Sequence, residues 1–146
     1  MKFKMLALLS VTALAAAAAA TAAAPPIVAT PVAIGTMQAT TIHAQKGAAV
    51  LDLITIQPGG NFGWHVHGAP VAVIVTGGTL TVFDPTVQGC ELFKVSKGQS
   101  FVEPANHVHL ARNDGTTKVT LYAFFMGLGK PSQATVPKTQ PEGCNA

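Results

Sequence analysis

Turn-forming residues recur at short intervals between residues 37 and 126, and this spacing restricts the fold more than any other feature. They stand at Pro58-Gly59-Gly60, Gly77-Gly78, Ser96-Lys97-Gly98, Pro104-Ala105-Asn106 and Asn113-Asp114-Gly115. The segments between them show no convincing helical period, and several are rich in β-branched residues. The pattern predicts an all-β barrel or sandwich, with short strands at residues 37–45, 49–57, 71–75, 79–83, 91–95, 99–103, 107–112 and 118–126.

One turn signal also predicts which strands pair. Gly77-Gly78 stands between two apolar runs, and a glycine pair in this position is typical of a two-residue β-hairpin. Residues 71–75 and 79–83 are therefore predicted to be hairpin partners, and Asp84-Pro85 is predicted to end the second strand.

Residues 1–24 have the features of a cleaved secretory signal peptide. Lys2 and Lys4 form a basic start, an alanine-rich apolar segment follows, and Ala22-Ala23-Ala24 supplies the small residues typical of a cleavage site. The rival interpretation is an uncleaved membrane anchor, but the segment is only weakly apolar and short for crossing a bilayer. We therefore expect a periplasmic or secreted protein with no membrane attachment after cleavage. An extended N-terminal arm at 25–36, a β-domain at 37–128 and a surface tail at 129–146 follow.

Cleavage would also change the balance of charge. The full chain has nine basic and six acidic residues, a net charge of +3. Without Lys2 and Lys4 the net charge is 9 − 2 − 6 = +1. Because the remaining sequence has no cluster of Lys and Arg that could follow a row of phosphates, we expect no nucleic-acid partner.

The chain has two cysteines, Cys90 and Cys144. In an exported protein an even number of cysteines favours a disulfide, although two unrelated free thiols are the alternative. Neither lies in a Cys-x-x-Cys motif, so thiol redox catalysis is not expected. We predict a bridge between Cys90 and Cys144 that holds the C-terminal tail.

Two histidines stand where glycine-rich chain gives way to an apolar run. His65 and His67 are two residues apart, and on a strand such residues point to the same face. Two imidazoles aimed at one point suit a metal that prefers nitrogen ligands. The alternative interpretation is a pair of exposed histidines at a strand edge, and the motif needs structural context before it indicates a metal site.

A second motif downstream gives this pair a context. Gly98, Pro104, His109 and Asn113 follow the spacing of glycine, five residues, proline, a turn residue, histidine and asparagine. Gly59, His65, His67 and Gly78 follow the spacing of glycine, five residues, His-x-His and a later glycine. Together and in this order they resemble the two signature motifs of the cupin superfamily. The resemblance implies a single-domain cupin-type β-barrel, a double-stranded β-helix or jelly roll, at residues 37–128.

The resemblance also implies a set of metal ligands. His65, His67 and His109 match the family's histidines and would bind one divalent transition metal, with iron as the first choice and zinc, copper, nickel or manganese as alternatives. The family's glutamate would fall at Val71 or Ala72, neither of which can bind metal. Three neutral imidazoles would leave the metal its full charge. Asn106 replaces the usual glycine of the second motif, and asparagine tolerates left-handed backbone.

Two further residues are accessory candidates. His107 lies two residues before His109 and either shares its face or belongs to the turn or rim. Glu103 precedes Pro104 and either acts as an acid or base near the metal or faces solvent or orients a neighbour. Water, substrate or His107 would complete the metal's coordination.

Three functions are compatible with these motifs. The first is an iron-dependent dioxygenase or an isomerase or lyase of a small organic substrate. The second is a non-catalytic cupin that binds a small molecule, and the third is a structural cupin without metal. The catalytic residues and the substrate are not predicted. Because exposed strand edges are costly to leave bare, we also expect a homodimer.

Overall fold

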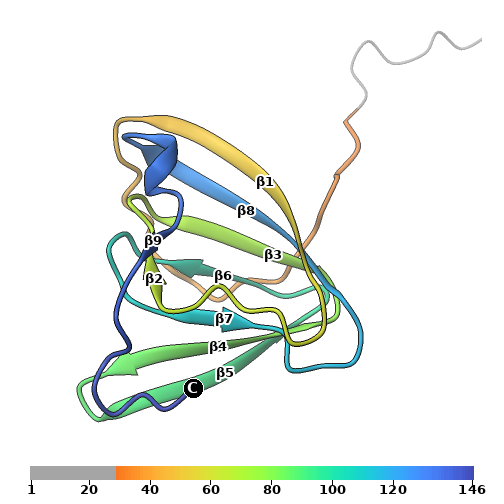
Figure 1. Ribbon diagram of the computed structural model, residues 1–146. Coiled ribbons are helices and arrows are strands. Elements are labelled where there is room, and N and C mark those ends of the chain that lie inside the picture. The colour runs from red at the N-terminus through yellow and green to blue at the C-terminus, as the bar shows by residue number, and fades with distance from the viewer. Residues whose placement is uncertain (1–28) are drawn as a thin grey trace, which may run out of the picture. The chain divides into compact units, whose positions relative to one another are not determined.

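Strands β1 (Ala48–Ile56), β8 (Val119–Leu128), β3 (Val71–Gly77) and β6 (Ser100–Glu103) form an antiparallel sheet in that order. The computed structural model describes residues 29–146, of which 31–146 form one unit. The predicted signal peptide at 1–24 and the first residues of the arm at 25–36 lie outside the described residues. A three-stranded sheet has the order β5 (Gly89–Ser96), β4 (Thr79–Thr86) and β7 (Leu110–Arg112) (Figure 1).

The core lies between these two sheets. Buried side chains alternate along β3 and β8, so one face of the four-stranded sheet turns inward. They pack in one cluster with residues of the three-stranded sheet, and its members include Val73, Val75, Leu80, Val82, Val95, Leu121 and Phe125. The all-β expectation is confirmed, because two antiparallel sheets enclose the main apolar core.

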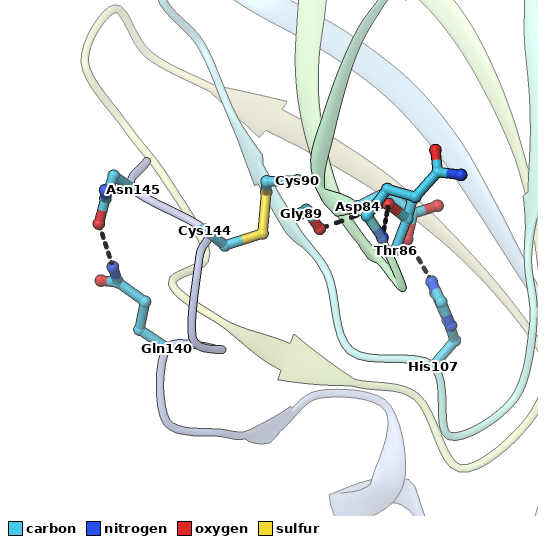
Figure 2. The surroundings of a disulfide bond; sticks show 9 residues. Asp84, Thr86, Gly89, Cys90, His107, Gln140, Cys144 and Asn145 are labelled. Carbon is cyan, nitrogen blue, oxygen red and sulfur yellow. Dashed lines mark hydrogen bonds and ion pairs between the residues drawn. A yellow bond between two sulfur atoms is a disulfide. The ribbon is translucent and has the colours of Figure 1, made fainter.

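The C-terminal segment crosses outside the two main sheets. After β8 a short 3-10 turn, η1 (Pro131–Gln133), leads into β9 (Val136–Pro137), which pairs with β2 (His65–Val66). Further on, Cys144 is fully buried and forms a disulfide with Cys90 of β5 (Figure 2). The predicted bridge is therefore confirmed, and the predicted tail contributes a strand as well as lying on the domain surface.

Two predicted elements are absent from the part of the chain that the structure describes. Residues 37–45 form no strand, and nearly all of them are exposed. Their β-branched residues have strand propensity but no apolar alternation, so nothing sets a buried face. The predicted hairpin is also absent, because β3 and β4 lie in different sheets. The chain changes sheets at Gly78, which has φ 71°, and a Cβ there would lie 2.7 Å from the Lys118 carbonyl oxygen.

Strand β4 also runs beyond the predicted stop at Asp84-Pro85. Pro85 pairs with Cys90 on β5, while the pairing with β7 ends at Phe83. Proline is tolerated here because its missing N–H faces the side without a partner strand. Strand β7, in contrast, begins at Leu110, later than the predicted start at residue 107.

Asn113 ties the second motif to the sheet. Its side chain is 1% exposed, donates hydrogen bonds to the carbonyls of Ile56 (3.0 Å) and Thr117 (2.8 Å), and accepts one from the Gly115 N–H (3.0 Å). We expect Asn113→Ala to lower the free energy of unfolding by about 2–3 kcal/mol, because it leaves buried backbone groups unpaired. Urea denaturation would measure this loss. The matched control is Asn145→Ala, an exposed position where a change within about 0.5 kcal/mol is expected.

Candidate metal centre

The three histidines come together through backbone pairing. The N–H groups of His65 and His109 each donate to the other's carbonyl, both at 3.0 Å, so the two residues lie side by side. His67 is two residues beyond His65, and their ring centroids are 4.8 Å apart. All three side chains are buried, and their candidate ligand atoms lie within 4.8 Å of one another. In the described part of the chain they form the one such cluster of potential metal ligands.

Backbone carbonyls fix the orientation of each ring. The Nδ1 atom of His65 donates to the Gly63 carbonyl at 2.9 Å, and that of His109 donates to the His107 carbonyl at 3.1 Å. His67 Nδ1 donates to the carbonyl of Ala134 in the C-terminal segment. A carbonyl can only accept, so each Nδ1 carries the proton. The Nε2 atoms of neutral rings are then left as acceptors, which is the form that binds metal.

One of these Nε2 atoms is both completely buried and without a hydrogen-bond partner. His109 Nε2 is buried, and among residues 29–146 it is one of two buried side-chain nitrogen or oxygen atoms without a hydrogen-bond partner. It lies 3.2 Å from Glu103 Oε1 without hydrogen-bonding alignment. An unsatisfied buried nitrogen is costly, and a metal ion would satisfy it. The donor set and this atom both fit a nitrogen-ligated divalent metal.

One interpretation expected Glu103 to face solvent, but the structure buries it. It is 9% exposed and lies at the end of β6, with one carboxylate oxygen 3.0 Å from His67 Nε2 and the other 3.2 Å from His109 Nε2. Burial alone would raise the pKa of this carboxyl, but the imidazoles of His109 and His67 outweigh it and lower the pKa to about 2. A carboxylate thus accompanies the histidines.

The same surroundings shift the pKa values of His65 and His109 in opposite directions. Burial lowers the pKa of His65 to about 4, because the charged ring would lose its hydration. Burial also disfavours the charged form of His109, but the adjacent Glu103 carboxylate outweighs that effect and raises the pKa of His109. Without metal, burial therefore favours the neutral form of His65, whereas the Glu103 carboxylate favours the charged form of His109.

His107 lies apart from the cluster. Its Nε2 contacts Asp84 Oδ1 of β4, and both side chains are about one-third exposed (Figure 2). The turn that begins at Pro104 places His107 on the rim, as one of the two interpretations of this residue expected. Asn106 in this turn has φ 59°, the left-handed conformation expected where the family has glycine.

A small cavity adjoins the histidines. It measures about 40 Å³ and is lined by His65, His67 and Glu103 together with apolar residues, which include Ile54, Phe62, Val73, Leu121 and Phe125. Such a space holds a few water molecules or a ligand of few atoms. The sequence predicted the histidines, but not this lining, because which side chains converge depends on how the two sheets close.

The C-terminal segment completes the surroundings of the site. Besides the Ala134 carbonyl, it supplies hydrogen bonds from the Lys138 N–H to the Trp64 carbonyl (2.8 Å) and from the Gly68 N–H to the Gln133 carbonyl (2.8 Å). These contacts surround the His65–His67 stretch. No local pattern in the sequence predicts them, because Ala134 acts through its backbone and is far from His67 along the chain.

Comparisons with known proteins agree with this architecture. An oxalate oxidase structure superposes with a TM-score of 0.52 at 21% identity, covering 61% of this chain and 45% of that one. Peruvianin-I, a cysteine peptidase from Thevetia peruviana latex, gives a TM-score of 0.50 at 21% identity, covering 60% and 56%. A Klebsiella pneumoniae protein with a double-stranded β-helix domain gives 0.49 at 18% identity, covering 64% and 79%. At these identities the likeness concerns the fold alone.

No curated protein matches the sequence. The model of one family, described as the cupin domain, matches residues 52–125. This match covers half of the chain and contains both histidine motifs, in agreement with the double-sheet architecture. The chain belongs to the cupin domain family.

Proposed function

We propose that this protein is a metal-dependent cupin in which His65, His67 and His109 hold one divalent transition metal through their Nε2 atoms. The observation that carries the proposal is the shared orientation of the three rings. Each ring donates a hydrogen bond from its Nδ1–H to a backbone carbonyl, which leaves its Nε2 as an acceptor, and one ligand atom from each ring lies within 4.8 Å of the others. A bound metal would supply a Lewis-acidic or redox-active centre beside the apolar cavity.

The donor set restricts the metal. Imidazole nitrogen suits iron, zinc, copper, nickel and manganese, whereas calcium and magnesium prefer oxygen. Iron is the first choice for a dioxygenase, and the other four remain alternatives. Three protein nitrogens leave coordination positions free for water or substrate, as a catalytic metal requires.

The cavity restricts the substrate. Its volume of about 40 Å³ and its apolar lining favour a small organic molecule, with its polar group on the metal and its carbon atoms against Val73 and Phe125. The chain's own residues would orient that molecule and exclude water around it. Oxygenation or isomerisation of such a substrate is the proposed activity, and non-catalytic binding of the same molecule is the alternative.

The protein's location and assembly complete the proposal. Export after removal of residues 1–24 is supported by the Cys90–Cys144 disulfide, since disulfides persist in oxidising compartments. No helix among residues 29–146 has the length and apolar character of a membrane span. A homodimer is supported by β1, an edge strand that exposes Leu51 and Leu53.

Metal content tests the site directly. We expect purified protein, loaded anaerobically with iron or with zinc, to hold one equivalent of metal by mass spectrometry. His67→Ala and His109→Ala each remove a ligand and should abolish both this equivalent and the rise in melting temperature that metal produces. His107→Ala is the matched control and should retain both, because His107 contacts Asp84 instead.

If His67→Ala keeps one equivalent with an unchanged melting response, the three-histidine site is wrong. Oxygen consumption by iron-loaded protein with a panel of small organic acids, thiols and diketones then separates the two candidate activities. Turnover that His109→Ala eliminates supports an oxygenase. Saturable binding of one of these compounds without oxygen uptake, with the compound recovered unchanged, supports a binding protein.

A further inference from the structure

The family's carboxylate is missing from its usual strand, yet a carboxylate is present in the cluster. The motif places that glutamate at Val71 or Ala72 of β3, and of these Val71 is 1% exposed and lines the cavity beside the histidines. Val71 pairs directly with Glu103 of β6 in the antiparallel register. Residues paired in this way carry their side chains on the same face, within about 5 Å of each other at Cβ. Glu103 therefore enters the same space from the neighbouring strand.

The contacts of Glu103 with His67 and His109 require a proton or a metal ion between the facing atoms. The ring proton of His67 and that of His109 each lie on Nδ1, so in the neutral rings both Nε2 atoms are acceptors. A carboxylate also only accepts, yet its oxygens lie 3.0 Å and 3.2 Å from these two atoms. Buried acceptors facing one another repel, unless a proton or a metal ion lies between them.

The spacing also suits a shared metal. Ligand atoms at about 2.1 Å from one metal ion are about 3.0 Å apart at a right angle and about 3.4 Å apart in a tetrahedron. The two separations between Glu103 oxygens and imidazole nitrogens fall within that range. Among the described residues, a further carboxylate–imidazole contact joins Asp84 to His107, which follows the turn at Pro104. Both of these side chains are partly exposed and lie outside the cluster.

We propose that Glu103 is the fourth protein ligand of the metal, a carboxylate moved from strand β3 to the facing position on β6. The inference rests on the proposed three-histidine site and deepens it. It changes the expected electrostatics, because a divalent metal with three neutral imidazoles and one carboxylate carries a net charge of +1. The site would then attract an anionic substrate less strongly than a site made of histidines alone.

Binding of Co²⁺ tests this proposal without requiring any activity. Glu103→Gln keeps the shape of the side chain and removes its charge. We expect it to weaken Co²⁺ affinity by about 100-fold or more, at the upper end of the range for losses around metal sites. It should also change the visible absorption of the bound ion, which reports the ligand set. The matched control is Asp84→Asn, which neutralises the carboxylate of the other pair and should leave both affinity and spectrum unchanged.

A double variant provides the decisive comparison. In Val71→Glu with Glu103→Val, the carboxylate returns to β3 opposite its present position. We expect this exchange to restore Co²⁺ affinity to within about 10-fold of the original protein, well above that of Glu103→Gln. Thermal melting in EDTA checks that each variant folds. If the exchanged variant does not fold, the spectrum of the isosteric Glu103→Gln variant decides the question.

Three outcomes separate the possibilities. Affinity and spectrum unchanged in Glu103→Gln would overturn the proposal and leave the three-histidine site intact. Weaker binding with an unchanged spectrum would also overturn it, because Glu103 would then only position the imidazoles. Failure of the original protein to bind Co²⁺, iron or zinc would overturn the proposed function itself, and this inference with it.

Discussion

Replacing Cys90 and Cys144 together by alanine is expected to lower the free energy of unfolding by about 4 kcal/mol. The bridge joins residues 54 apart in the sequence, and in the chain-entropy model a closed loop of this size restricts the unfolded chain by about that amount. Cys144 is fully buried against Trp64, Phe83 and Leu110, so alanine is preferred over serine, whose hydroxyl would be buried without a partner. The loss therefore combines a freer unfolded chain with poorer packing.

Urea denaturation followed by tryptophan fluorescence would measure this change. Trp64 is the single tryptophan of the chain and lies in the cluster with Cys144, so its emission reports the region directly. The measurement is made in EDTA, so that metal binding does not contribute. Original protein reduced with dithiothreitol should show most of the same loss. A loss below about 1 kcal/mol in both samples would show that other contacts hold the C-terminal segment.

Acidification of the metal-free protein is expected to cost about 2.5 kcal/mol between pH 7 and pH 4.5. The cause is His65, whose pKa burial lowers from 6.5 to about 4. A histidine whose pKa is lowered by folding binds its proton more readily in the unfolded chain. The free energy of unfolding is therefore highest above pH 6.5 and falls as the pH approaches 4. Each pKa unit of this difference corresponds to about 1.4 kcal/mol.

The neighbouring groups change the stability mainly outside the range from pH 4.5 to pH 6.5. The raised pKa of His109 gives a stabilisation that is complete below pH 6.5 and declines only at higher pH. The lowered pKa of Glu103, about 2, gives one that is complete above pH 4.5 and is lost at lower pH. Between these limits His65 alone sets the slope expected from the cluster's shifted groups.

Denaturation series at several pH values in EDTA would measure the slope. His65→Gln should flatten it, while the exposed His43→Gln serves as the control and should leave it unchanged. An equal decline in His65→Gln and in the original protein would contradict the assignment of this pH dependence to His65.

The two-residue repeat of strands was enough to predict β1, β8 and the shared face of His65 and His67 from the sequence. Residues 49–57 and 118–126 alternate in sequence and form β1 and β8, because one face of each packs against the core. His65 and His67 share a face because a strand repeats every two residues. His109 could be added only through the family resemblance, since its backbone pairing with His65 is long-range.

Features that depend on the closing of two sheets could not be predicted in this way. The glycine pair at 77–78 has the composition of a hairpin, but the core contacts of β4 place it in the opposite sheet. Glu103 is placed in the cluster by its register with Val71, which its local sequence does not specify. A polar residue before a proline is ordinarily read as exposed, and only the structure shows that this one is buried.

The hydrogen bond between His67 and the Ala134 carbonyl implies an order of maturation. Synthesis proceeds from the amino end, so Ala134 and Cys144 are made after every strand of the two main sheets. Until that last segment is laid across β2, His67 lacks the acceptor that fixes its tautomer. Under the proposed function, a newly made chain would therefore bind its metal only after this segment, which the bond between Cys90 and Cys144 holds, has paired with β2. Placement of the C-terminal segment and completion of the metal site would then be coupled steps in producing the working protein.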